Sequence, residues 1–136
     1  MVRVIMGKKG SGKTKQMIDM INSAVTTEHG NVVCIERGPK LTYDIHYKIR
    51  LVEASAYDLD SFTALRGFIC GLCAGDYDIT HIFIDSLYKI SVCDDTQQTE
   101  AFLQWCDDFG KANKIDFTIS ISADVATASE GIKKFF

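Results

Sequence analysis

The sequence predicts an α/β domain, a three-layer α/β/α sandwich built on a mostly parallel sheet of about five strands. Short β-branched apolar runs alternate along the chain with segments that have helical periodicity. The apolar runs are nearly continuous, which is typical of strands buried on both faces of a parallel sheet. The chain has 136 residues, close to the commonest domain size, so we expect residues 1–136 to form one domain.

Three strands and two helices are expected in the first half. The apolar runs that predict strands are residues 2–6, 31–35 and 49–53. A helix with apolar residues at helical spacing is expected after residue 14, ending before Gly30. Residues 41–48 alternate loosely and fit either a short edge strand or an irregular segment. Residues 59–74 carry apolar residues three and four apart, which predicts a helix.

The second half repeats the alternation. Residues 81–85 predict a strand with three consecutive apolar residues and Asp85 at its end. A helix is expected from about residue 95 to 112. A strand at 117–121 and a last helix at about 124–134 complete the pattern. Ligands bind at the carboxyl ends of the strands in such sheets, so residues that follow the strands are the candidates for a site.

Residues 7–14 read GKKGSGKT, a complete match to the P-loop pattern G-x-x-x-x-G-K-[ST] between an expected strand and an expected helix. Glycines permit positive φ and close backbone approach, so successive N–H groups can surround an anion. Lys13 can reach the β- and γ-phosphates, and the Thr14 hydroxyl can ligate Mg²⁺. The expected nucleotide-binding residues are Gly7, Lys8, Lys9, Gly10, Ser11, Gly12, Lys13, Thr14 and Lys15.

Asp85 is an acidic candidate for the same site. An acid after an apolar strand, downstream of a P-loop, is the Walker B arrangement, in which the carboxylate holds Mg²⁺ through bound water close to Thr14. The alternative is an ordinary helix cap or turn residue. Ser86 follows Asp85, whereas many P-loop ATPases have a catalytic Glu there.

On residues 7–14 and 82–85 the chain resembles the P-loop NTPase superfamily, and specifically the RecA-like ATPase core. The resemblance implies ATP and Mg²⁺ as ligands, with Lys13 in a catalytic role. It also implies a catalytic Glu at the end of a strand beside the P-loop strand, and Glu36 is the first candidate. Glu36 could instead be a surface partner of Arg37 or Lys40, and Glu53 is the second candidate for the base.

The resemblance further implies a polar residue that senses the γ-phosphate at the end of the strand after Asp85. Ser120 and Ser122 are available, although a solvent-facing position for Ser120 and a helix N-cap for Ser122 are the simpler interpretations. No arginine is singled out by its spacing. An arginine supplied by a second copy or by a protein partner would make activity depend on assembly. The candidates within the chain are Arg37, Arg50 and Arg66.

The leading functional hypothesis is an ATP-binding protein with slow Mg²⁺-dependent hydrolase activity. One alternative is a small nucleoside or nucleotide kinase, although the chain has no arginine-rich lid. Another is a non-hydrolysing nucleotide-dependent interaction module, which could dock through the tail at Phe135 and Phe136 or pack that tail on the sheet. The N-K-x-D sequence of residues 113–116 precedes an expected strand, so we interpret it as a chance match rather than a guanine-binding motif.

Composition argues against several classes of protein. A net charge of −3 argues against a broad nucleic-acid surface, and no apolar run could span a membrane. With no signal peptide in the sequence, we expect a cytoplasmic protein with reduced thiols. Cys70 and Cys73 have C-x-x-C spacing, but we expect them to be buried small apolar residues because no other ligands complete a zinc site.

Overall fold

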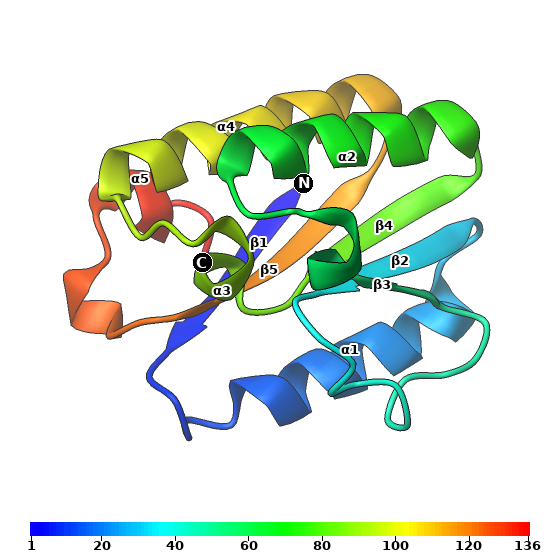
Figure 1. Cartoon of the computed structure of the whole chain (residues 1–136), viewed down its shortest axis with the longest axis horizontal. Coiled ribbons are helices and arrows are strands. Elements are labelled where there is room, and N and C mark those ends of the chain that lie inside the picture. Colours follow the sequence, from blue (N-terminus) through cyan, green and yellow to red (C-terminus); the bar gives the residue numbers. More distant parts are fainter.

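The computed structural model describes residues 1–136 and contains a five-stranded, all-parallel sheet with helices on both faces (Figure 1). The strands are β1 (Val2–Gly7), β2 (Asn31–Glu36), β3 (Arg50–Glu53), β4 (Ile79–Ile84) and β5 (Asp116–Ser122). The helices are α1 (Lys13–Thr27), α2 (Phe62–Gly75), α3 (Leu87–Ser91), α4 (Thr96–Asn113) and α5 (Glu130–Lys133). Two 3₁₀ turns span Ala54–Tyr57 and Val125–Thr127.

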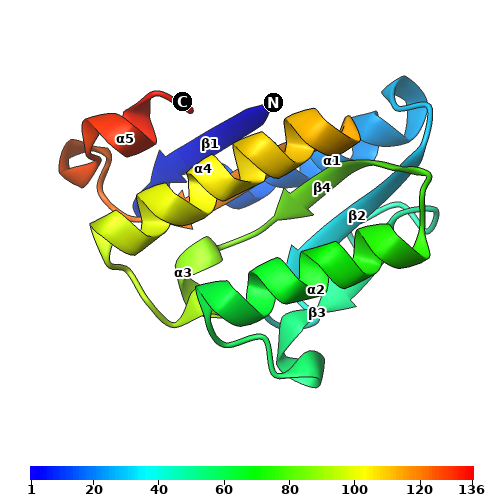
Figure 2. The same cartoon turned by 90° about the horizontal axis from the view of Figure 1, so that it is seen from above.

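The two faces of the sheet bury separate cores. Helix α1 covers one face and helices α2 and α4 lie side by side on the other (Figures 1 and 2). Successive residues of a strand point to opposite faces. In β2, Val33 and Ile35 therefore join the core under α2 and α4, while Val32 and Cys34 join the core under α1. This double burial explains the continuous apolar runs in the sequence.

The order of the strands is β1-β5-β4-β2-β3. Because every pair is parallel, the carboxyl ends of all five strands lie along one edge of the sheet. The expectation that Glu36 ends a strand beside β1 is wrong. Strand β2 lies between β4 and β3, and two strands separate it from β1. Crossover connections decide which strands become neighbours, and a run of apolar residues does not reveal them.

Local hydrogen bonds explain why several helices begin at other residues than expected. The helix expected at 59–74 begins at Phe62, because the Ser61 hydroxyl accepts the Ala64 N–H at 3.0 Å and caps it. The single helix expected at 124–134 is wrong. The Asp124 side chain accepts the Ala126 N–H and forms a 3₁₀ turn, so only the short helix α5 follows. Helix α3 was not expected at all.

Residues 41–48 form an irregular segment, which confirms one of the two alternatives for them. Leu41, Ile45 and Ile49 are buried in this region and pack into the core under α1. At the end of the chain Phe135 is also buried, and its carbonyl accepts the Val4 N–H at 2.7 Å. None of the helices combines the length and the apolar composition needed to cross a membrane.

All five cysteines are free thiols, and Cys34 and Cys106 are fully buried. The expected burial is wrong for Cys70, which is exposed on α2 because the apolar face of that helix is turned away from it. Cys73 is half-buried, and burial, with smaller effects of Cys70 and Asp76, raises its pKa to about 11. A thiol with that pKa is protonated at neutral pH, which makes Cys73 a poor nucleophile.

Candidate functional site

The loop between β1 and α1 is a sharp turn built on two glycines. Gly10 has φ 86° and Gly12 has φ 88°, a left-handed conformation that side chains with a Cβ atom disfavour. Gly12 is also the residue that precedes the first turn of α1. The two glycines therefore allow the chain to leave β1 and enter α1 within five residues.

Several N–H groups of this loop have no acceptor in the chain. The N–H groups of Lys9, Gly10 and Gly12 make no hydrogen bond to backbone or side chain. Helix α1 begins without a side-chain cap and without an acidic residue in its first turn. The positive end of a 15-residue helix is thus uncompensated, which is the arrangement that binds an anion.

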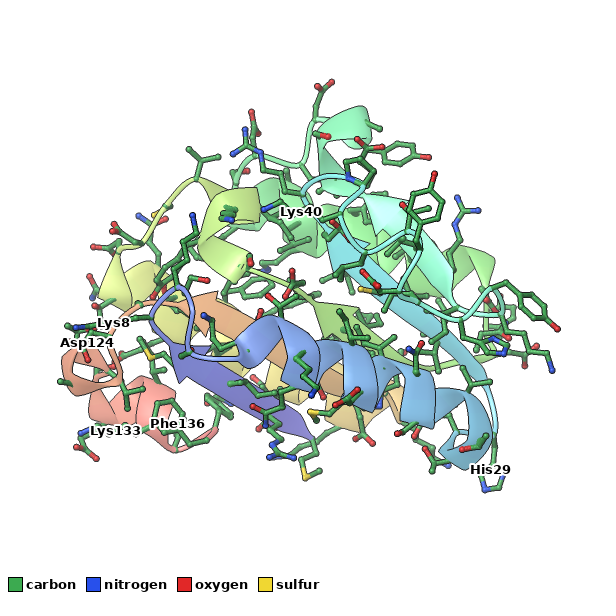
Figure 3. The ribbon with its side chains drawn as sticks, turned by 90° about the horizontal axis from the view of Figure 1, so that it is seen from below. Lys8, His29, Lys40, Asp124, Lys133 and Phe136 are labelled. Carbon is green, nitrogen blue, oxygen red and sulfur yellow. The ribbon has the colours of Figure 1, made fainter.

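Lys13 lies across the loop and Lys8 points away from it. The Lys13 ammonium donates to the Lys8 carbonyl at 3.0 Å, and the Ser11 N–H donates to the same carbonyl at 3.1 Å. The Lys8 ammonium is 3.4 Å from Asp124 Oδ2, and Figure 3 shows the two side chains together at one end of the molecule. Lys13 is therefore the ammonium that the fold holds at the loop.

Asp85, directly after β4, is positioned by Ser120 of β5. The Ser120 hydroxyl donates to Asp85 Oδ1 at 2.9 Å and accepts the Ser86 N–H at 2.8 Å. Ser120 is 1% exposed, so the interpretation of a solvent-facing position is wrong. Alternation along β5 turns its side chain toward the α1 face, where β5 lies between β1 and β4. Ser122 is the last residue of β5 rather than a helix cap.

Glu36 is buried and holds the segment that follows it. Its Oε1 accepts the Lys40 N–H at 2.8 Å and its Oε2 accepts the Leu41 N–H at 2.9 Å. Its side chain is not a surface partner of Arg37 or Lys40, since the residue is 3% exposed and its partners are backbone groups. Burial raises the pKa of Glu36 above its usual value and nearby Asp85 adds to this, against the two backbone N–H groups.

A cavity of about 700 Å³ brings these groups together at the carboxyl edge of the sheet. Thr14, Glu36 and Asp85 line it, with polar residues from the segments after β2, β3 and β4. Hydroxyl and carboxylate oxygens suit a hard cation such as Mg²⁺, and the Thr14–Asp85 side of the cavity offers both. The lining residues that sequence reasoning had not singled out are Gly38, Pro39, Leu41, Asp44, Ser55, Ser86 and Lys89.

The three candidate arginines differ in their placement. Arg37 lines the cavity, as does Glu53 at the end of β3. Arg50 begins β3 and so lies toward the opposite edge of the sheet. The Arg66 guanidinium lies 5.0 Å from the centre of the Trp105 ring, outside the site. Among the arginines, only Arg37 borders the cavity. Lys89 could not be anticipated from periodicity, because it lies in the unexpected helix α3.

The N-K-x-D sequence of residues 113–116 ends α4 and begins β5, at the edge of the sheet opposite the cavity.

No known protein-family profile matches the chain, and a search of curated protein sequences finds no significantly similar relative. Function must therefore be argued from the geometry of the site.

Proposed function

We propose that the chain binds ATP with Mg²⁺ and hydrolyses it, as a member of the P-loop NTPase superfamily with a RecA-like core. The observation that carries the proposal is the uncapped start of α1, whose loop leaves the N–H groups of Lys9, Gly10 and Gly12 without acceptors. The triphosphate supplies acceptor oxygens and negative charge for these groups. Lys13 adds a positive charge at the same place.

Thr14 and Asp85 would hold Mg²⁺ at the cavity. Adjacent strands lie about 4.8 Å apart, so β4 is about 10 Å from β1 across the intervening β5. This span favours a bound water between the Asp85 carboxylate and the ion, with the Thr14 hydroxyl as a direct ligand. Ser120 fixes Asp85 Oδ1, while Oδ2 accepts only a long contact of 3.5 Å from the Ser86 hydroxyl and keeps a lone pair for that water.

Glu36 is the proposed base that orients the attacking water. Each carboxylate oxygen already accepts one backbone N–H and keeps a second lone pair toward the cavity. Its raised pKa brings the carboxylate closer to the value at which a general base is most effective near neutral pH. The same contacts tie Glu36 to the Lys40–Leu41 segment, so its position and that of the segment depend on each other.

We assign ATP rather than GTP because the only sequence match to a guanine-binding motif lies at the wrong edge of the sheet. A phosphotransferase is the second candidate, and it is favoured by how far the cavity extends away from the glycine-rich loop. Thr14 is its only lining residue from the glycine-rich loop, while most of the lining comes from segments after β2 and β3. That space lies beyond Asp85, where a phosphoryl acceptor could bind.

A single assay separates the two candidates. The full chain is incubated with γ-labelled ATP and Mg²⁺, with and without a panel of nucleosides and nucleotides, and labelled phosphate and labelled acceptors are resolved. The ATPase proposal predicts release of inorganic phosphate that Lys13→Ala abolishes. Lys48→Ala, which removes an exposed side chain that makes no hydrogen bond or ion pair and lies outside the cavity, should leave the release unchanged. Label on an acceptor would favour the kinase, and phosphate release that survives Lys13→Ala would refute both.

A further inference from the structure

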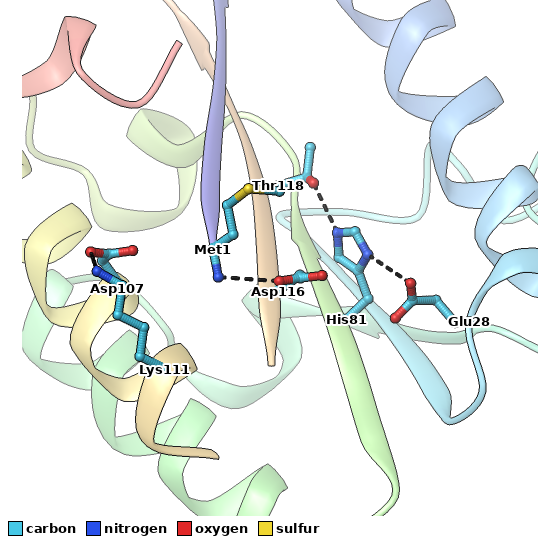
Figure 4. Close-up of polar contacts among 7 residues, drawn as sticks. All are labelled: Met1, Glu28, His81, Asp107, Lys111, Asp116 and Thr118. Atoms are coloured by element: carbon cyan, nitrogen blue, oxygen red, sulfur yellow. Dashed lines mark hydrogen bonds and ion pairs between the residues drawn. The ribbon is translucent and has the colours of Figure 1, made fainter. Parts of the chain in front are cut away.

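A second cluster of ionisable side chains lies at the opposite edge of the sheet from the cavity. Glu28 follows the last turn of α1, His81 lies in β4, and Asp116 begins β5 beside it, in register with His81 (Figure 4). One ligand atom from each residue, a ring nitrogen of His81 and a carboxylate oxygen of each acid, lies within 4.8 Å of the other two. The proposed nucleotide site does not use any of the three.

The fold orients the His81 ring. One ring nitrogen, Nε2, is 2.8 Å from Thr118 Oγ1, and the ring stacks on Phe83 with centroids 4.1 Å apart and 9° between the planes. In the tautomer with a proton on Nε2, that N–H donates to Thr118 and the lone pair of Nδ1 faces Glu28. Metal-ligating histidines are typically oriented by a hydrogen bond of the ring nitrogen that does not bind the ion, and the contact of Nε2 with Thr118 can play that part here.

We propose that Glu28, His81 and Asp116 bind a divalent transition-metal ion of the zinc class. Nδ1 of His81 is 3.8 Å from Glu28 Oε2, too far for a hydrogen bond. Two atoms that each lie 2.0–2.1 Å from one tetrahedral zinc ion are about 3.3 Å apart, so a small closure would complete the contact. One imidazole and two carboxylates leave the fourth position for water.

The surroundings favour a cation. Helix α1 ends here with no basic residue in its last turn, so its negative end adds to the two carboxylates. The one positive group at the cluster is the Met1 ammonium, which is 3.1 Å from Asp116 Oδ1 and leaves Oδ2 free.

An ion could reach the cluster from solvent. Glu28 and His81 also line a cavity of about 310 Å³ between α1 and the sheet, to which Phe83 and Asp19 contribute. The side chains of His81 and Glu28 are 15% and 20% exposed. The site is thus sheltered enough to hold an ion in place and open enough to admit it with one water.

Cobalt(II) is the probe that tests the proposal, because its visible absorption reports tetrahedral coordination. The parent protein carries Cys70→Ser and Cys73→Ser, which removes the C-x-x-C pair as a competing ligand. Titration of the full chain should show one Co²⁺ per chain, displaced by Zn²⁺, and Zn²⁺ should raise the temperature of unfolding. His81→Gln and Glu28→Gln should each weaken affinity at least about tenfold.

The other two histidines supply matched controls. His29 is exposed beside Glu28 in the sequence, and His46 lies in the irregular 41–48 segment. His29→Gln and His46→Gln should leave the affinity unchanged. Absence of the tetrahedral absorption, or equal affinity in the parent, His81→Gln and Glu28→Gln proteins, would show that the cluster is only an ion pair of protonated His81 with Glu28. Because Glu28→Gln removes a partly exposed side chain without a hydrogen bond, it keeps the test valid if His81→Gln does not fold.

Discussion

Replacement of Ser120 by alanine is the sharpest test of how the sheet positions Asp85. The Ser120 hydroxyl makes two hydrogen bonds, one to Asp85 Oδ1 at 2.9 Å and one from the Ser86 N–H at 2.8 Å. The residue is 1% exposed, so water cannot replace the hydroxyl without rearrangement. Ser86 also has φ 56°, a conformation that its surroundings must hold in place.

The expected cost of Ser120→Ala follows from these contacts. A buried N–H left without an acceptor costs about 1–3 kcal/mol, and we take about 2 kcal/mol for the loss of the Ser86 contact and the Asp85 contact together. For a chain of this length that corresponds to a fall of about 7 °C in the unfolding temperature. Asp85 would also lose its fixed orientation, so the affinity for Mg²⁺-nucleotide should fall more than the affinity for nucleotide alone.

Urea denaturation with an unchanged m value measures the stability, and calorimetric titration with and without Mg²⁺ measures the binding. Ser122→Ala is the matched control, because Ser122 lies two residues further along β5 on the same face and makes no side-chain hydrogen bond. Its free energy of unfolding should change by less than about 0.5 kcal/mol. Equal stability and equal Mg²⁺ dependence in the Ser120→Ala and Ser122→Ala proteins would refute the positioning role of Ser120.

Three further predictions rest on separate features. The pKa of Glu36 is raised in the folded chain above its usual value of about 4.5. Its contribution to the free energy of unfolding is therefore present below about pH 4.5 and is lost as the pH rises through the raised, folded-state pKa. Denaturation at several pH values should show this loss in the parent protein and not in Glu36→Gln. Gly110→Ala should destabilise the chain by about 1–3 kcal/mol, because the added Cβ would lie 2.4 Å from the Ile115 carbonyl oxygen. In the same assay Gly67→Ala, in α2, should stabilise the chain by about 0.5–1 kcal/mol, because no atom lies within 4 Å of the added Cβ. Gly12→Ala should cost about 1–2 kcal/mol at φ 88° and weaken phosphate binding measured by titration.

Much of the fold could be predicted from hydrophobic pattern alone. The run of residues 31–35 predicts β2 because both faces of that strand are buried. The spacing after Thr14 predicts α1 because one side of that helix, with Met17, Ile21 and Ala24, is buried and the other is not. The last helix could not be predicted, because Asp124 bonds to the backbone locally and diverts the chain into a turn. Helix α3 has five residues, too few to show a period.

The site was predictable where it depends on a local motif and unpredictable where it depends on neighbouring strands. The glycine-rich loop is contiguous in the sequence, so its shape follows from Gly10 and Gly12. The contact of Ser120 with Asp85 joins residues 35 positions apart and requires β5 to lie beside β4. The sequence therefore indicated both residues as candidates but favoured a solvent-facing position for Ser120, because no local pattern reveals the order of the strands.

Nucleotide binding by the intact chain is the measurement that tests the central claim most directly. Thermal unfolding is followed with ATP, GTP and a non-hydrolysable ATP analogue, each with and without Mg²⁺. At a ligand concentration 100 times the dissociation constant, binding to the folded state adds about 2.7 kcal/mol, or about 9 °C for this length. We predict such a rise with Mg²⁺-ATP and its loss in Lys13→Ala, whereas no rise with any nucleotide would contradict the assignment of the Gly7–Thr14 loop as a phosphate site.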